Sequence, residues 1–100
     1  MITHIVLWKL HDHADGRSRE ENAQLAKSQL EALLGKIPGL LHIEVGMDVL
    51  HTDASADLCL YAHLESLAAL EAYQVHPEHQ AVVPLMKRIT SSRTVIDYES

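Results

Sequence analysis

A tyrosine and two histidines fall within seven residues in the stretch "AYQVHPEHQAVVP", which runs from Ala72 to Pro84. Histidine is a common general base near neutral pH, and a tyrosine hydroxyl can hold the oxygen of an enolate. Tyr73 and His79 are therefore candidates for removing a proton from a carbon acid flanked by carbonyls. The structural alternative is that His79 only caps or packs at the junction between two helices.

The proline in this stretch indicates where the second helix begins. Pro77 suits the first position of a helix, and the residue before a proline is biased away from helical angles. We therefore expect His76 at the cap and His79 in the first helical turn. Unpaired N–H groups at a helix start, together with burial, oppose protonation of an imidazole. The pattern predicts a pKa for His79 below the value of about 6.5 for a free histidine.

The three-residue spacing of His76 and His79 also occurs in metal sites. No set of carboxylates and histidines completes such a site here, and Cys59 is far away in the sequence. We therefore expect no metal and no cofactor.

The surrounding segments must position these residues. Apolar periodicity predicts strands at 2–11, 40–50, 58–65 and 91–99. The polar loop 11–22 leads into a helix with an apolar stripe from Ala23 to Ile37. A second helical segment covers 67–75. It resumes at Pro77 and reaches about Ile89, with an interruption at Pro84. This order predicts an α+β fold of the ferredoxin-like βαββαβ type, a four-stranded antiparallel sheet with helices on one face.

Strand alternation assigns residues to the two faces of the sheet. In the second strand, one face is expected to carry Leu41, Ile43, Val45, Met47 and Val49. In the first strand, His4 shares a face with Val6 and Trp8, and alternation leaves open whether that face meets the helices or the other side. Because both faces are apolar and helices cover only one, we expect two copies to pack sheet against sheet as a homodimeric α+β barrel enclosing a pocket.

Length and composition limit the class of protein. A chain of 100 residues forms one domain, 1–100. A formal net charge of -6 without a basic run argues against nucleic acid and anionic membranes as partners. No apolar stretch approaches the ~20 residues of a membrane helix, no leader is evident, and Cys59 has no disulfide partner. We therefore expect a cytoplasmic protein.

Three segments, "ITHIVLWKL", "AYQVHPEHQAVV" and "VIDYE", stand in an order and spacing that resemble the stress-responsive α/β-barrel (Dabb) family over essentially the whole chain. The resemblance implies a ferredoxin-like fold, a homodimeric barrel and an association with stress response. One similar plant branch is a cofactor-independent polyketide cyclase, which closes a linear poly-β-ketone by aldol condensation. The resemblance places its tyrosine and histidine pair at Tyr73 and His79 and its first-strand histidine at His4. Leu58 stands where that cyclase has a further histidine.

Two functions of different class follow from these observations. In the first, the homodimer binds a small apolar or aromatic molecule without catalysis. In the second, it is a cyclase-like or monooxygenase-like enzyme with His79 as general base, Tyr73 as oxyanion partner and His4 as orienting group. The candidate ligand contacts are Val6, Trp8 and His76. Pocket polarity separates the two, because carbon–carbon chemistry needs at least two converging polar groups in a dry cavity.

Overall fold

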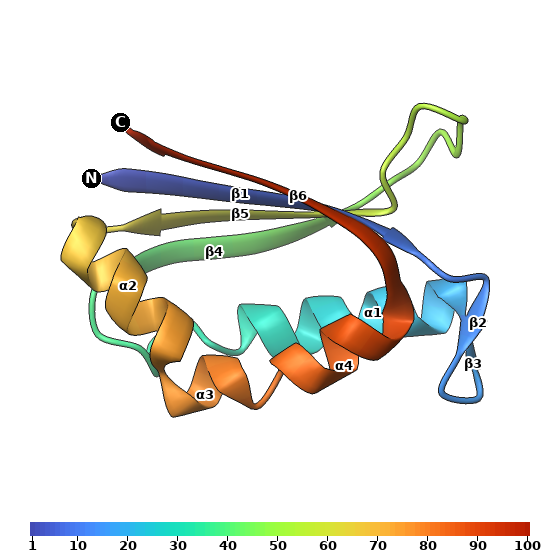
Figure 1. Cartoon of the computed structure of the whole chain (residues 1–100), viewed down its shortest axis with the longest axis horizontal. Coiled ribbons are helices and arrows are strands. Elements are labelled where there is room, and N and C mark those ends of the chain that lie inside the picture. The colour runs from blue at the N-terminus through green and yellow to red at the C-terminus, as the bar shows by residue number, and fades with distance from the viewer.

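A four-stranded antiparallel sheet carries all of the helices on one face (Figure 1). The computed structural model describes all 100 residues. The strands of the sheet are β1 (Ile2–Leu10), β4 (Leu40–Met47), β5 (Leu58–Leu64) and β6 (Thr90–Glu99), and the helices are α1 (Arg19–Glu31), α2 (Leu67–Val75), α3 (Pro77–Gln80) and α4 (Val83–Ile89). The sheet order is β4-β5-β1-β6, which confirms the predicted ferredoxin-like α+β fold. None of the helices has the length and apolar character needed to cross a membrane.

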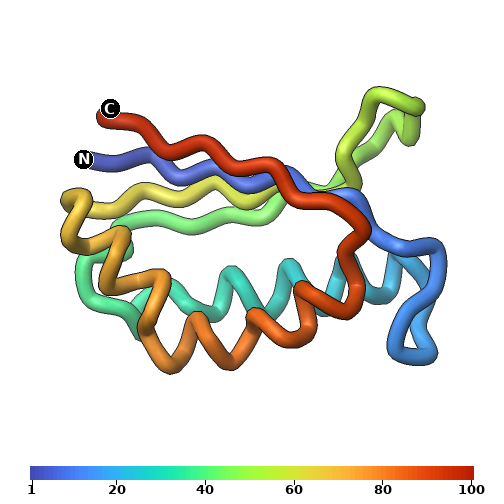
Figure 2. Tube along the Cα trace, in the orientation of Figure 1, coloured from blue at the N-terminus to red at the C-terminus, as the bar shows by residue number.

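The first and last strands lie side by side, so the two ends of the chain meet at one end of the sheet (Figure 2). Within β1, Val6 and Trp8 are buried against the helices, whereas Leu7 is exposed on the opposite face. Alternation left open which face of the sheet carries His4, Val6 and Trp8, and the structure shows that it is the face toward the helices. The face carrying His4, Val6 and Trp8 lines space inside one chain, and not a space enclosed between two sheets.

Helix α1 begins with a capping box. The hydroxyl of Ser18 accepts from the N–H of Glu21, and the Glu21 carboxylate accepts from the N–H of Ser18. The helix ends at Glu31, earlier than the apolar stripe predicts, because the following N–H groups bond to carbonyls three residues back and tighten the chain into turns. Leu33 and Ile37 lie in these turns and are still buried.

The segment before α1, predicted to be a loop, contains a short ribbon of β2 (His13–Ala14) and β3 (Arg17–Ser18). Asp15 and Gly16 connect the two strands with φ values of 54° and 73°. Two residues with positive φ are the requirement of a tight hairpin turn, which Asp-Gly satisfies. The ribbon lies outside the four-stranded sheet.

The second strand of the sheet departs from the predicted alternation at both ends. Leu40 is buried and Leu41 is 50% exposed, because the pairing register with β5 shifts between Leu40 and His42. Ile43 and Val45 are buried as predicted, but the strand ends at Met47. The expectation that Leu41, Met47 and Val49 share the buried face was therefore wrong.

The helical segment after β5 is divided into three pieces. Ser66 caps α2 by accepting from the N–H of Ala69, and Pro77 opens α3. The break between α3 and α4 falls before Pro84, which lies in the first turn of α4, where a proline is tolerated. As a result, α2 carries Tyr73 and α3 carries His79.

Candidate active site

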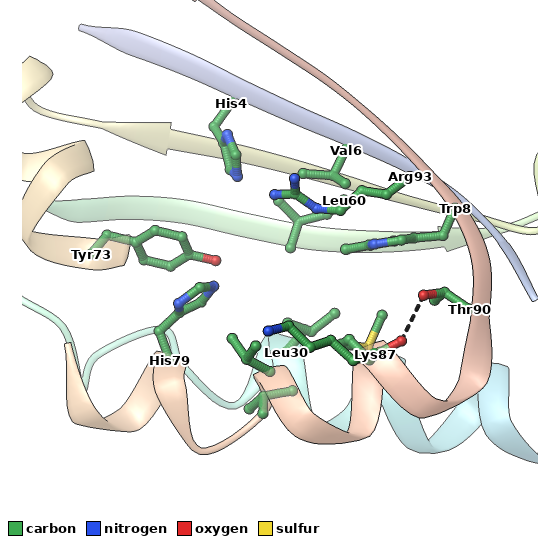
Figure 3. A pocket seen from close by; sticks show the side chains of 13 residues that line it. His4, Val6, Trp8, Leu30, Leu60, Tyr73, His79, Lys87, Thr90 and Arg93 are labelled. Atoms are coloured by element: carbon green, nitrogen blue, oxygen red, sulfur yellow. Dashed lines mark hydrogen bonds between the residues drawn. The ribbon is translucent and has the colours of Figure 1, made fainter. Parts of the chain in front are cut away.

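A cavity of about 230 Å³ lies between the helices and the sheet, and eight of its 13 lining residues are hydrophobic. Its apolar wall includes Val6, Trp8, Leu30, Leu60, Val82 and Met86. Its polar and charged groups are the side chains of His4, His79, Lys87, Thr90 and Arg93, together with the hydroxyl of Tyr73, whose ring is counted among the hydrophobic residues (Figure 3). A small number of polar groups in an apolar cleft is the usual composition of a site for a small molecule.

Tyr73 and His79 are in contact across the junction between α2 and α3. Their ring centroids are 4.4 Å apart, with an angle of 43° between the planes. Tyr73 is buried, and its hydroxyl, which makes no hydrogen bond within the chain, points into the cavity (Figure 3). Burial raises the pKa of Tyr73 to about 12, although Arg93 acts in the opposite direction. At neutral pH the phenol therefore stays protonated and can donate a hydrogen bond to a ligand.

The His79 ring is held by the backbone of the preceding helix. Its Nδ1 lies 3.2 Å from the carbonyl oxygen of Gln74. A carbonyl can only accept, so Nδ1 carries the hydrogen and Nε2 of the neutral ring remains free to accept a proton.

The pKa of His79 is lowered mainly by burial. The hydrogen bond to Gln74 opposes this change, and neighbouring His4 and Arg93 add to it. The predicted direction is confirmed, and burial, one of the two causes expected, is the main one. The ring is thus kept neutral, in the form that a general base requires.

A third ring, that of His4, borders Tyr73. Their centroids are 5.9 Å apart in an edge-to-face arrangement. Nδ1 of the buried His4 is hydrogen-bonded to the carboxylate of Asp97, which is its direct partner in the register of β1 and β6. Since a carboxylate accepts, Nδ1 carries the hydrogen and Nε2 is left for other contacts.

Five of the six predicted site residues line the cavity: His4, Val6, Trp8, Tyr73 and His79. His76 does not. Its Nδ1 accepts from the N–H of Glu78 at 3.1 Å, which makes it the cap of α3 and directs its ring to that backbone. The expected cap position of His76 is thus confirmed, and its contact with a ligand stays a prediction that the lining of this cavity does not support.

Sequence reasoning missed Asp97, Lys87 and Arg93. Asp97 and Arg93 are four residues apart on β6, so alternation places them on the same face of the strand, and the register puts them opposite His4 and Trp8. An acidic residue in the last strand facing a histidine in the first was a usable signal. Lys87 lies in the last turn of α4 and carries no comparable signal.

The structure also bears on two other chemistries, metal binding and a cysteine nucleophile. No three His, Cys, Asp or Glu side chains come together in a way that would hold a metal ion. Burial, and the neighbouring Glu44, raise the pKa of the Cys59 thiol, which disfavours the nucleophilic thiolate.

Comparison with known proteins gives the family. A model of the Stress Responsive A/B Barrel Domain matches residues 2–100. An uncharacterized protein of Streptomyces coelicolor is 33% identical over 100 residues, covering 99% of each chain. A dimeric protein of unknown function with a ferredoxin-like fold from Bacteroides fragilis is 31% identical, with a TM-score of 0.86 over 99% of this chain and 95% of that one.

A dimeric ferredoxin-like protein of unknown function from Thermobifida fusca has the same fold, with a TM-score of 0.85 and 23% identity over 99% of this chain and 90% of that one. These matches extend over nearly the full chain, and they agree with the sheet order and the helices on one face. The chain belongs to the stress responsive A/B barrel domain (Dabb) family.

Proposed function

We propose that this protein is an enzyme that removes a proton from the carbon next to a carbonyl group in a small, largely apolar molecule. The observation that supports it is the convergence of Tyr73 and His79 in one apolar cavity. A binding protein without catalysis needs no such pair, whereas proton abstraction needs a base and a donor for the developing oxyanion.

His79, Tyr73 and His4 each have a role in this proposal. Nε2 of His79 takes the proton, the electrons of the broken C–H bond move into the enolate, and the negative charge develops on the carbonyl oxygen. The Tyr73 hydroxyl donates to that oxygen. His4, with its tautomer fixed by Asp97, orients the same end of the ligand. In a cyclase-like reaction the enolate carbon then attacks a second carbonyl of the same molecule, and the resulting alkoxide takes the proton back from His79.

The proposal also includes a homodimer that pairs through the face of the sheet turned away from the helices. On that face, Leu7 and Ile96 are 41% and 57% exposed, and Tyr98 is exposed beside them. An apolar patch of this kind usually marks an interface. The related structures from Bacteroides fragilis and Thermobifida fusca are described as dimeric, which supports the same assembly here.

The test of the reaction is hydrogen–deuterium exchange on ethyl benzoylacetate, an uncharged β-ketoester with one aromatic ring. In D₂O, ¹H NMR follows the loss of signal from the carbon between the two carbonyls. We expect the protein to accelerate this exchange above the buffer rate, and His79→Ala to remove the acceleration.

The matched control is His11→Ala, which removes an exposed histidine outside the cavity and should leave the rate unchanged. If the wild-type protein leaves the buffer rate unchanged, or if His79→Ala accelerates exchange as well as the wild type, the proposed role of His79 is wrong.

A further inference from the structure

Two positively charged side chains at the cavity, Lys87 and Arg93, make no hydrogen bond or ion pair within the chain. The chain carries 14 acidic residues against 8 Lys and Arg, so carboxylates outnumber the cations. The other cations mostly have partners: Arg17, Arg19, Lys27 and Arg88 pair with carboxylates, and Lys9 donates to a backbone carbonyl. The nearest acid on the same strand face, Asp97, is engaged by His4.

The two cations reach the cavity from different elements. Arg93 lies on β6 opposite Trp8, and Lys87 lies on α4. Figure 3 shows that both head groups point toward the end of the cavity where Tyr73 and His79 meet. The positive charge of Arg93 acts on the rings of Tyr73 and His79, since it lowers the pKa of both. The charges are therefore directed at the proposed reaction centre.

Apart from these two cations and the polar groups of His4, Tyr73, His79 and Thr90, the cavity wall is apolar. A ligand that suits it therefore has an apolar body and one negative end. We infer that the cavity takes a small aromatic or alkyl carboxylate, with its carboxylate held by Arg93 and Lys87 and its apolar body against Trp8 and Leu60. The planar guanidinium matches the two oxygens of a carboxylate, and the ammonium adds a point charge. The cavity volume of about 230 Å³ is below the ~300 Å³ lower end for drug-sized ligands, which limits the body to about one ring.

This inference rests on the proposed function, because it takes the same cavity as the reaction site and narrows its substrate to keto acids. Arg93 and Lys87 line the same cavity as Tyr73 and His79. A keto group near the bound carboxylate would therefore lie in the space that these two rings border. The same cations favour the additional negative charge of the enolate. Substrate recognition and charge stabilisation then use the same pair of side chains.

Binding is measurable without any reaction, because Trp8 is the only tryptophan of the chain and lines the cavity. Its fluorescence reports the affinity of two probes, 4-oxo-4-phenylbutanoate and the methyl ester of the same acid. We expect the acid to bind about tenfold or more tightly than the ester, the factor that corresponds to one charge-assisted hydrogen bond. Raising the salt concentration should weaken the binding of the acid and leave the binding of the ester unchanged.

The variants Arg93→Gln and Lys87→Gln should each lower the affinity for the acid about tenfold and leave the affinity for the ester unchanged. Both positions are exposed, and unchanged ester binding shows that each variant is still folded. The matched control is Lys36→Gln, which removes an exposed cation outside the cavity and should change neither affinity.

Equal wild-type affinities for acid and ester, or no binding of the acid, would overturn the inference, as would an equal effect of Lys36→Gln. The reaction is tested separately by deuterium exchange on the uncharged β-ketoester. Exchange without acid preference contradicts only the carboxylate site. If the protein prefers the acid, and this preference depends on Arg93 and Lys87, but the protein does not accelerate exchange, only the proposed reaction is contradicted.

Discussion

His4 and Asp97 face each other across neighbouring strands, and Nδ1 of the histidine is hydrogen-bonded to the carboxylate. The two residues are 93 positions apart in the chain, and they meet because β1 and β6 are the first and last strands of the sheet and pair directly. Both side chains lie on the face toward the helices. The last strand therefore sets the tautomer of a buried histidine that borders Tyr73.

The first prediction concerns Asp97 as a positioning residue. Asp97→Ala removes the acceptor of the Nδ1 hydrogen, so we expect ¹⁵N NMR to show His4 shifting toward the tautomer protonated at Nε2. Proton exchange on the β-ketoester should fall about tenfold or more, a modest share of what general acid–base groups contribute. Leaving Nδ1 of the buried ring without its hydrogen-bond partner should also cost about 1–3 kcal/mol of unfolding free energy.

Asp97→Asn is the conservative comparison, because its side-chain oxygen can still accept from Nδ1. It should keep the wild-type tautomer and most of the exchange rate. If Asp97→Ala loses activity while the His4 tautomer stays as in the wild type, the aspartate acts by some route other than positioning.

Much of the fold was predictable because its signals are local. Ser66 before an apolar helical run and Pro77 at the next helix start both act on their own neighbours. The bulge that buries Leu40 and exposes Leu41 had no such signal, since it arises from pairing between β4 and β5. The end of α1 was also missed, because turns continue the apolar pattern of the helix beyond Glu31.

The candidate site was predictable only in part for the same reason. Tyr73 and His79 are close in sequence, and their contact follows from one helix junction. Which way His4 faces depends on where the helices lie, and its bond to Asp97 depends on pairing of the two chain ends. The cap position of His76 was predictable, because it follows from Pro77 as the next residue, and its ring does cap α3.

The second prediction is a pH dependence. Because the pKa of His79 is lowered in the folded protein, the neutral ring persists to a lower pH than in an unfolded chain. Proton exchange should therefore remain constant from neutral pH down to about 6.5 and decline only as the pH falls through the lower folded value. Below about 6.5 the unfolded chain binds this proton first, so His79 should also lower folding stability there, and have no such effect at higher pH.

The measurement is an NMR titration of the His79 ring, repeated on the urea-unfolded chain. The folded value should be the lower of the two, and it should coincide with the midpoint of the exchange profile. A folded value equal to or above the unfolded one would remove the physical basis for His79 as a general base.

The third prediction distinguishes the effect of the Tyr73 hydroxyl on the reaction from the effect of its ring on stability. Its hydroxyl has no partner within the chain, so Tyr73→Phe should change stability by less than about 1 kcal/mol. The ring is fully buried, so Tyr73→Ala should cost about 3–5 kcal/mol. Tyr73→Phe should nevertheless slow exchange on the β-ketoester by about 10²-fold or more, the usual effect of removing one oxyanion donor. Urea unfolding and the NMR exchange assay measure the two effects, and an unchanged rate in Tyr73→Phe would exclude the hydroxyl from the reaction.

The fourth prediction concerns assembly through the outer face of the sheet. Leu7 is on that face, while its neighbour Val6 is buried against the helices. Leu7→Lys should leave a folded single chain, because the charge would be buried in the dimer but solvated in the monomer. Val6→Lys should unfold the chain instead, since it puts the charge into the core. Sedimentation and circular dichroism distinguish these two results.

The control for this prediction is Leu34→Lys, which changes a leucine of similar exposure in the turns after α1, outside the sheet. It should sediment as the wild type does, because its side chain takes no part in the proposed interface. Two outcomes contradict the assembly: a wild-type protein that sediments as a single chain at micromolar concentration, or a Leu7→Lys variant that remains dimeric. A Leu7→Lys variant that remains dimeric would show that the interface lies on another surface, because a lysine in the centre of an apolar interface lacks both water and a partner.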